Sequence, residues 1–173
     1  QQKKVIHFIS MPGEGYRLLE HFYTFIHFED PMMDRYYKRF VRDFVHYIDT
    51  IFCKAALIVH DLERLGNGSF SSFHIRRGEF QYKEVKIPVA EMLANIGEHI
   101  PKNQLIYVAT DEKNKTFFNA FKQRWPHVRY LDHYMDFAGL SNINPNFLGM
   151  IDQVVCTRGE QFIGTWFSTF SGY

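Results

Sequence analysis

Two adjacent arginines at the end of a predicted strand are the first residues of this sequence that could bind a ligand. Residues 74–80 read HIRRGEF. Guanidinium groups bind phosphate through two parallel hydrogen bonds, so this segment suits an anion. Because side chains alternate between the faces of a strand, His74 and Arg76 share one face, and Arg76 is our candidate for the ligand. The alternative is a surface ion pair between Arg77 and Glu79 with Arg76 in a loop salt bridge, and the residues alone favour it.

A second candidate site lies near the end of the sequence, where residues 162–171 read FIGTWFSTFS. Hydroxyl groups and exposed backbone N–H groups at the start of a helix form a phosphate site. Ser168 and Thr169 would donate to a diphosphate, and Phe170 would lie against a base or a sugar. The alternative is that the hydroxyls are ordinary helix caps and the aromatic rings belong to the core. The residues alone leave these two interpretations even.

Two aspartates are placed next to apolar residues, one after an apolar run and one within an apolar stretch. Asp111 comes one residue after the apolar run 105–109, and we interpret it as the N-cap of the next helix. Asp152 is the one acidic residue in the apolar stretch MIDQVV, so it needs a partner. That partner is either Arg158 or the hydrogen-bond donors of a nucleobase.

Several other classes of site are absent from the sequence. Among nine histidines there is no His-x-x-x-His pair beside a glutamate, and no glycine-rich nucleotide loop or nucleophile elbow occurs. Cys53 and Cys156 are too few for a disulfide framework and are not spaced as a zinc site. A net charge of +1 without a Lys/Arg run argues against a nucleic-acid partner. No segment approaches the roughly 20 apolar residues that span a bilayer.

The elements that must position these residues begin with a helix. Asp30 as N-cap and Pro31 in the first turn start it, and apolar residues then recur in steps of three and four up to Leu62. We therefore predict one long amphipathic helix that ends near Gly66. A short strand over residues 4–9 precedes it.

Strands and helices alternate after residue 66. The predicted strands are residues 70–75, 105–109, 128–131 and 161–164, and the predicted helices are 88–100, one that Asp111 caps, 147–156, and another after residue 165. This alternation predicts an α/β domain with a Rossmann-like parallel sheet, in which ligands bind at the carboxyl ends of the strands. We divide the chain into residues 1–66, a strand and a long helix, and residues 67–173, the sheet domain.

Taken in order, these motifs resemble the GDP-fucose protein O-fucosyltransferases. The HIRRGEF segment resembles the family's His-x-Arg strand-end motif, in the form of the thrombospondin-repeat branch and its plant and algal relatives. Residues 106–111, IYVATD, are similar to the family's strand that closes in Ala-Thr-Asp. Most specific is the series IDQ at 151–153, Cys156, FIGT at 162–165 and STFS at 168–171. The resemblance covers residues 70–173.

The resemblance implies a role for each candidate residue. The family has a GT-B fold of two Rossmann-like lobes, and this chain resembles the C-terminal lobe that binds the nucleotide sugar. By position, Arg76 grips the diphosphate and supports its departure, and His74 orients that arginine or a phosphate. Asp152 contacts guanine, and Ser168, Thr169 and Phe170 form the nucleotide-binding turn.

The implied reaction is an inverting transfer of fucose from GDP-fucose to a Ser or Thr hydroxyl of a protein acceptor. It uses no metal and no cofactor, and it takes place in the secretory pathway, in the endoplasmic reticulum or Golgi. Two glycosylation sequons, at Asn67 and Asn114, agree with that route. The catalytic base is expected in the other lobe, so we assign none, and we expect residues 1–173 to be inactive alone. Glu79 stands where the branch tends to have Asp.

Two alternatives to this function stay open. One is a glycosyltransferase of the same fold that uses another GDP sugar. The other is a non-catalytic nucleotide-binding or interaction module that keeps the fold.

Overall fold

The computed structural model describes residues 29–78, 83, 86–166 and 168–172. The chain forms two compact units, residues 1–46 and 47–173. The helix that precedes residue 66 groups with the second unit, and the predicted division into residues 1–66 and 67–173 stays a prediction. The strand predicted over residues 4–9 lies outside the described residues.

In the first unit, the described residues form helix α2, Pro31–Phe44. Its predicted start is confirmed, because the Asp30 carboxylate accepts a hydrogen bond of 2.7 Å from the Met32 N–H and Pro31 occupies the first turn. Lys38 and Asp34 form an ion pair of 2.7 Å one turn apart. The helix ends at Phe44.

The prediction of one helix from residue 30 to residue 66 is wrong, because the helix is interrupted. Val45 and Ile48 have non-helical backbone dihedrals, and a second helix, α3, runs from Asp49 to Leu65. The interruption contains Val45, His46, Tyr47 and Ile48, all residues of modest helix propensity. The apolar spacing continues across it, from Phe44 to Ile48 to Ile51, so periodicity alone did not reveal the break.

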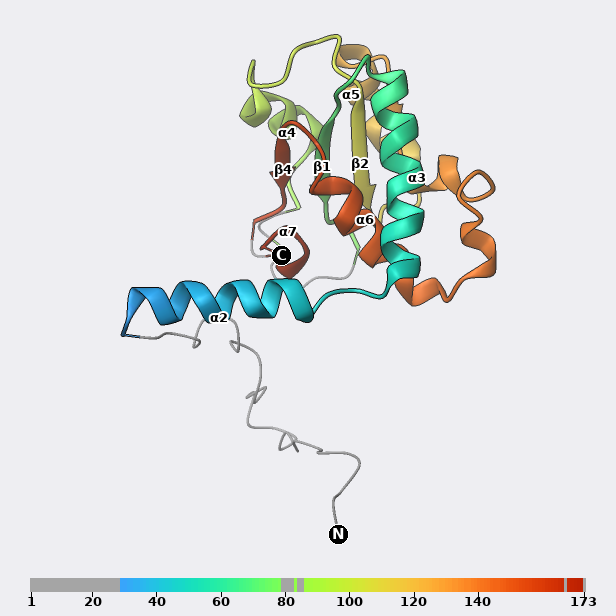
Figure 1. The fold of residues 1–173 in the computed structure, drawn as a ribbon. Coiled ribbons are helices and arrows are strands. Elements are labelled where there is room, and N and C mark those ends of the chain that lie inside the picture. Colours follow the sequence, from blue (N-terminus) through green and yellow to red (C-terminus); the bar gives the residue numbers. More distant parts are fainter. Residues whose placement is uncertain (1–28, 79–82, 84–85, 167, 173) are drawn as a thin grey trace, which may run out of the picture. The chain divides into compact units, whose positions relative to one another are not determined.

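The second unit is built on a four-stranded, all-parallel sheet with the order β3-β2-β1-β4. The strands are β1 (Ser71–Ile75), β2 (Ile106–Thr110), β3 (Val128–Arg129) and β4 (Phe162–Gly164). This arrangement confirms the predicted α/β fold with a Rossmann-like parallel sheet. Because β1 lies between β2 and β4, the segments that follow these three strands meet at one edge of the sheet (Figure 1).

Helices connect the strands and cover both faces of the sheet. The connections contain α4 (Val89–Ile96), the 3₁₀ helix Lys115–Phe118 with α5 (Asn119–Arg124), three 3₁₀ turns, and α6 (Leu148–Cys156). After β4 the chain forms the short α7, Thr169–Gly172, as predicted. No helix among the described residues is long and apolar enough to cross a membrane.

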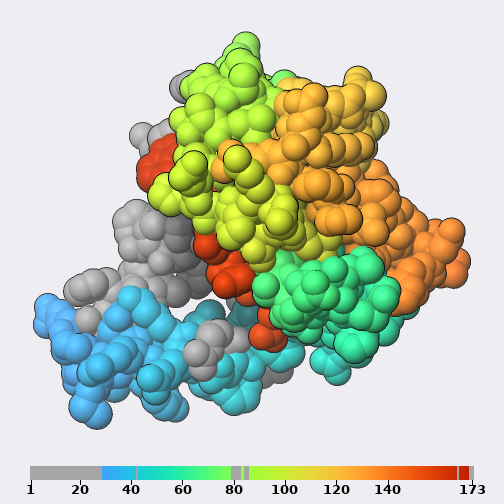
Figure 2. Space-filling view, turned by 90° about the horizontal axis from the view of Figure 1, so that it is seen from above, coloured from blue at the N-terminus to red at the C-terminus, as the bar shows by residue number. Residues whose placement is uncertain are grey.

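One face of the sheet packs against α3 and α6. The α3 residues in this core are Ile51, Ala55, Ile58 and Leu62, all at most 1% exposed and spaced by four, three and four residues. They share a cluster with Tyr107 and Ala109 of β2 and with residues that follow β3. Figure 2 shows blue-green α3 against these orange residues after β3.

The other face carries a second core cluster. Phe73, Ile106 and Val108 from the strands pack there with α4, α5 and the buried ring of Trp125. The Trp125 indole N–H donates to the Pro101 carbonyl at 2.9 Å. Alternate residues of β2 thus enter opposite clusters, as expected for a strand buried on both faces.

Replacing Ile58 with valine is expected to lower the free energy of unfolding by about 1 kcal/mol, because it removes one methylene from the fully buried face of α3. The matched control is Ile48→Val, at a position that is 54% exposed, which should leave the free energy of unfolding within about 0.5 kcal/mol. Urea unfolding of both variants measures the difference. Equal values would mean that α3 does not belong to the core.

Candidate functional site

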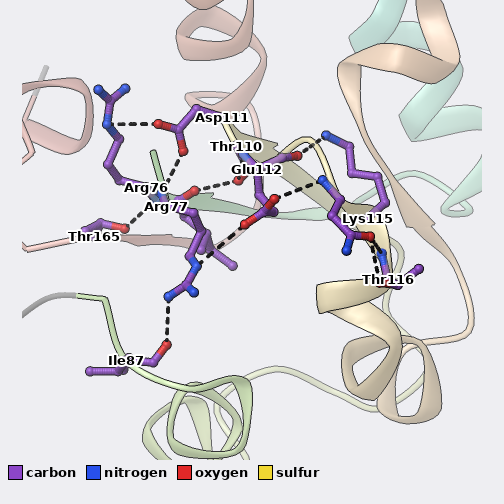
Figure 3. A network of polar contacts seen from close by, with 11 residues as sticks. Arg76, Arg77, Ile87, Thr110, Asp111, Glu112, Lys115, Thr116 and Thr165 are labelled. Carbon is purple, nitrogen blue, oxygen red and sulfur yellow. Dashed lines mark hydrogen bonds and ion pairs between the residues drawn. The ribbon is translucent and has the colours of Figure 1, made fainter. Parts of the chain in front are cut away.

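Residues from three different strand ends meet at the carboxyl edge of the sheet (Figure 3). Arg76, Arg77 and Gly78 follow β1, Asp111 and Glu112 follow β2, and Thr165 follows β4. This is the edge at which parallel α/β sheets bind ligands. The adjacent pairing of β1 with β2 and β4 is what brings these segments together.

Thr165 joins the ends of β1 and β4. Its backbone N–H and its hydroxyl group both lie 3.0 Å from the His74 carbonyl oxygen, as donors. The same hydroxyl oxygen accepts a 3.0 Å hydrogen bond from the Arg76 N–H. The first candidate segment is therefore in direct contact with the second.

Asp111 joins the ends of β1 and β2. Its Oδ1 accepts a 2.6 Å hydrogen bond from the Arg77 N–H, and its Oδ2 lies 3.1 Å from Nε of Arg76. Burial alone would raise the pKa of this carboxyl, but the backbone N–H groups of Arg77 and Gly78 and the charge of Arg76 hold it below its usual value. Asp111 is therefore an anion at neutral pH.

The prediction that Asp111 caps the next helix is wrong. The 3₁₀ helix begins at Lys115, and Asn114 caps it by accepting a 3.1 Å hydrogen bond from the Thr116 N–H. The capping rule is local in sequence, whereas the partners of Asp111 come from the neighbouring strand.

Arg76 and Arg77 have different surroundings. The Arg77 guanidinium donates to the Ile87 carbonyl at 3.3 Å, lies 4.2 Å above the Phe117 ring, and has its Nε 3.9 Å from Glu112. Its side chain is 21% exposed, against 40% for Arg76. Arg77 thus packs within the domain. Glu79, the partner that the alternative interpretation gave to Arg77, lies outside the described residues.

His74 is a buried, neutral side chain beneath this edge. It is 5% exposed, and its ring stacks on Phe170 with the centroids 3.9 Å apart. Its Nδ1 is 2.8 Å from the Ser171 hydroxyl. Burial, with the nearby Arg76 charge, lowers the pKa of His74 to about 4 although Asp111 opposes the shift. His74 therefore acts at neutral pH through hydrogen bonding and stacking, without a charge.

Ser168, Thr169 and Phe170 form the turn into α7. The Ser168 carbonyl accepts a 3.0 Å hydrogen bond from the Ser171 N–H, and Thr169 is the first helical residue. The Phe170 carbonyl accepts from the side chain of Gln153 at 3.4 Å. Phe170 is half-buried against the α3 and α6 core, and its ring also stacks on His74.

Asp152 lies in the core on α6, where it is 9% exposed. Its Oδ1 accepts a hydrogen bond of 2.5 Å from the Tyr107 hydroxyl of β2, so its partner within the protein is Tyr107 and not the exposed Arg158. Burial raises the pKa of Asp152 to about 7, although the Tyr107 hydrogen bond lowers it. This carboxyl therefore titrates near neutral pH.

The structure brings most of the predicted site residues together. His74 and Arg76 share contacts with the segment from Thr165 to Ser171. Asp152 is joined to that segment through its neighbour Gln153, which bonds to Phe170. The sequence reasoning missed the roles of Asp111 and Tyr107. The parallel pairing of two adjacent strands, one ending in Arg-Arg and the other in Thr-Asp, was the available signal for Asp111.

A groove of about 580 Å³ opens between α4 and β4 and reaches this edge, since His74 and Thr165 are among its lining residues. Glu91, Asn95 and His99 contribute polar groups from α4. Within the described part of the chain, no group of three His, Cys, Asp or Glu side chains could hold a metal ion. Cys53 and Cys156 are both free thiols.

Gly78→Ala is expected to lower the free energy of unfolding by about 1–2 kcal/mol. The added Cβ would fall 2.3 Å from Oδ2 of Asp111, and that carboxylate is fixed by its bonds to Arg76 and Arg77. Gly149→Ala is the control, because nothing lies within 4 Å of its added Cβ. In helix α6 it should stabilise by about 0.5–1 kcal/mol. Thermal or urea unfolding should therefore show opposite signs, and a neutral Gly78→Ala would mean that the carboxylate moves without cost.

Comparison with known proteins gives one family match. The model of a family described as GDP-fucose protein O-fucosyltransferase matches residues 8–173. No curated protein matches the chain.

Proposed function

Since this chain belongs to the GDP-fucose protein O-fucosyltransferase family, we propose that it supplies the donor-binding lobe of a fucosyltransferase. The enzyme transfers fucose from GDP-fucose to a Ser or Thr hydroxyl of a protein acceptor. The contact between Arg76 and Thr165 carries this proposal, because it joins the cationic strand end to the hydroxyl-rich turn at the ligand-binding edge of the sheet.

Arg76 binds the diphosphate of the donor in this proposal. During transfer the acceptor oxygen attacks the anomeric carbon of fucose from the face opposite the leaving group. The bond from that carbon to the diphosphate oxygen breaks, and GDP leaves with the electron pair. A cation at the diphosphate stabilises this growing charge, and Arg76 supplies it without a metal or cofactor. The acceptor proton passes to a base that we do not assign to any residue of this chain.

The turn after β4 binds the phosphates and one side of the nucleotide. The Ser168 and Thr169 hydroxyls donate to phosphate oxygens, and Phe170 forms a wall that its stacking on His74 holds in place. His74 contributes no charge at neutral pH. It positions Arg76 through its own carbonyl, which Thr165 links to the Arg76 N–H.

Asp152 recognises the guanine base. Guanine presents N–H donors, and an ionised carboxylate is their strongest acceptor among side chains. The Tyr107 hydroxyl occupies Oδ1, which leaves Oδ2 for the base. This contact should favour GDP over UDP, because guanine offers two adjacent N–H donors to the carboxylate and uracil offers one.

We also propose that the protein works in the secretory pathway, as its family membership suggests. Both sequon asparagines, Asn67 and Asn114, are exposed, so glycosylation there is sterically open.

Titration calorimetry of the full-length protein with GDP and UDP tests the proposal. Binding selective for GDP, followed by fucose transfer to a folded acceptor domain, is the expected result. GDP binding with turnover of a different GDP sugar would instead identify another glycosyltransferase. GDP binding without any turnover would favour a non-catalytic module, and absent or equal binding of both nucleotides would contradict the donor-binding role.

A further inference from the structure

Asp111 has an unusual set of partners for an acidic residue beside a candidate anion site. Its carboxylate contacts three consecutive residues of the turn after β1: the side chain of Arg76 at 3.1 Å, the N–H of Arg77 at 2.6 Å, and the N–H of Gly78. The close approach to Gly78 depends on the missing side chain, since a Cβ there would meet Oδ2 at 2.3 Å. The carboxylate thus fixes the backbone of this turn and one side chain at once.

The contact with Arg76 uses Nε, which is the inner nitrogen of the guanidinium group. Figure 3 shows the two terminal nitrogens of Arg76 directed away from Asp111. A guanidinium held through Nε keeps its plane fixed, and the two nitrogens of its outer edge have the geometry of the paired hydrogen bonds that phosphate accepts. Without such a contact, the long Arg76 side chain would lose more conformational freedom when a ligand binds.

We infer that Asp111 is a positioning residue that orients the Arg76 guanidinium for a nucleoside diphosphate. The inference rests on the proposed function, because it takes Arg76 as the diphosphate ligand. It adds a residue from the second strand end, which touches Arg76 and not the donor.

Electrostatic repulsion alone would change GDP affinity in the opposite direction. An isolated carboxylate near a diphosphate would repel it, so its removal would tighten binding. Here three N–H donors surround the carboxylate and offset its charge, so the loss of orientation should exceed the relief of repulsion. The direction of the change in GDP affinity on neutralising Asp111 therefore distinguishes the two effects.

A double-mutant cycle in the full-length protein tests the inference, with GDP affinity measured by calorimetry for wild type, Asp111→Asn, Arg76→Ala and the double variant. We expect Asp111→Asn to weaken GDP binding about tenfold when Arg76 is present and less than about twofold when it is alanine. Glu112→Gln is the matched control. It neutralises the next carboxylate on the same loop, whose partner is Arg77, and should leave GDP affinity within about twofold.

Three other results would overturn the inference, and each has a different cause. An equal loss in both backgrounds would show that Asp111 acts on the fold alone, which overturns the inference and leaves the Arg76 proposal intact. Tighter binding in Asp111→Asn would show that repulsion dominates and would also overturn it. If Arg76→Ala does not weaken GDP binding, the diphosphate role falls and the inference falls with it. Should Asp111→Asn unfold below the assay temperature, Gly78→Ala displaces the same carboxylate and replaces it in the cycle.

Discussion

Replacing Arg76 with alanine is expected to lower kcat for fucose transfer about 10²–10³-fold, which corresponds to roughly 3–4 kcal/mol of transition-state stabilisation. In our proposal the diphosphate gains negative charge as the glycosidic bond breaks, and Arg76 is the cation at that position. The interaction is stronger in the transition state than in the ground state, so kcat should fall more than the affinity for GDP-fucose. Steady-state kinetics with GDP-fucose and a folded acceptor measures both quantities.

The matched control for Arg76 is its neighbour, Arg77→Ala. Arg77 has the same charge, but its guanidinium donates to the Ile87 carbonyl and lies over the Phe117 ring. Its replacement should lower thermal stability and leave kcat within a few-fold of wild type. A kcat for Arg76→Ala within threefold of wild type, in a protein with normal thermal stability, would remove Arg76 from the reaction.

The central strands of the sheet were predictable from short segments between turn-forming residues, and residues 105–109 also form a continuous apolar run. Residues 70–75 and 105–109 are bounded by turn-forming or polar residues, and both become central strands of the parallel sheet. The choice between Arg76 and Arg77 also came from the sequence, through the alternation of strand faces. Their distinct surroundings agree with that choice, while the binding role of Arg76 stays a prediction.

The break between α2 and α3 was not predictable from the same kind of pattern. Apolar residues continue at helical spacing from Phe44 through Ile51, so the stripe looks unbroken. The helix ends because the backbone leaves the helical conformation between Val45 and Ile48. The residues of this segment have only slightly unfavourable helix propensities. Propensities this weak are readily overridden by tertiary contacts, so they could not outweigh the apolar spacing that predicted a continuous helix.

Contacts between distant segments account for the two missed roles in the site. Asp111 bonds to a residue 34 positions earlier, and Tyr107 bonds to one 45 positions later. Tyr107 reads as one more large residue of a buried strand, because its hydroxyl group changes nothing in the apolar pattern. Only the packing of α6 on β2 shows that this hydroxyl meets Asp152.

Asp152→Asn is expected to weaken GDP binding about 100-fold while leaving any weak UDP binding unchanged. In our proposal the guanine N–H groups donate to an ionised carboxylate, and such charge-assisted hydrogen bonds are worth about 1.5–3 kcal/mol. The asparagine amide would in addition face those donors with a donor of its own in one of its two orientations. Titration calorimetry at pH 8, where the wild-type carboxyl is ionised, measures the loss.

The same substitution should make the protein more stable at high pH. The pKa of Asp152 rises from 3.8 to about 7 on folding, mainly through burial, so the folded state favours the protonated carboxyl. Its contribution to stability is complete below pH 3.8 and is lost as the pH rises through 7. Asparagine stays neutral at every pH and can still accept the Tyr107 hydrogen bond. Relative to wild type, Asp152→Asn should therefore gain stability between pH 4 and pH 8, by up to about 4 kcal/mol.

Opposite changes in stability and in GDP affinity are what a functional buried carboxylate requires. If Asp152 served the fold alone, its replacement would lower the free energy of unfolding of the protein, or change it little, at all pH values. Asp152 is expected to lower stability when it is ionised and to bind guanine only in that state. Its replacement should therefore give a more stable protein that binds GDP poorly. Asn146→Asp, an exposed change in the segment before α6, controls for the gain or loss of one charge. Urea unfolding at pH 4, 6 and 8, beside calorimetry with GDP, separates the two cases: unchanged GDP affinity in Asp152→Asn would remove this residue from base recognition, whatever its effect on stability.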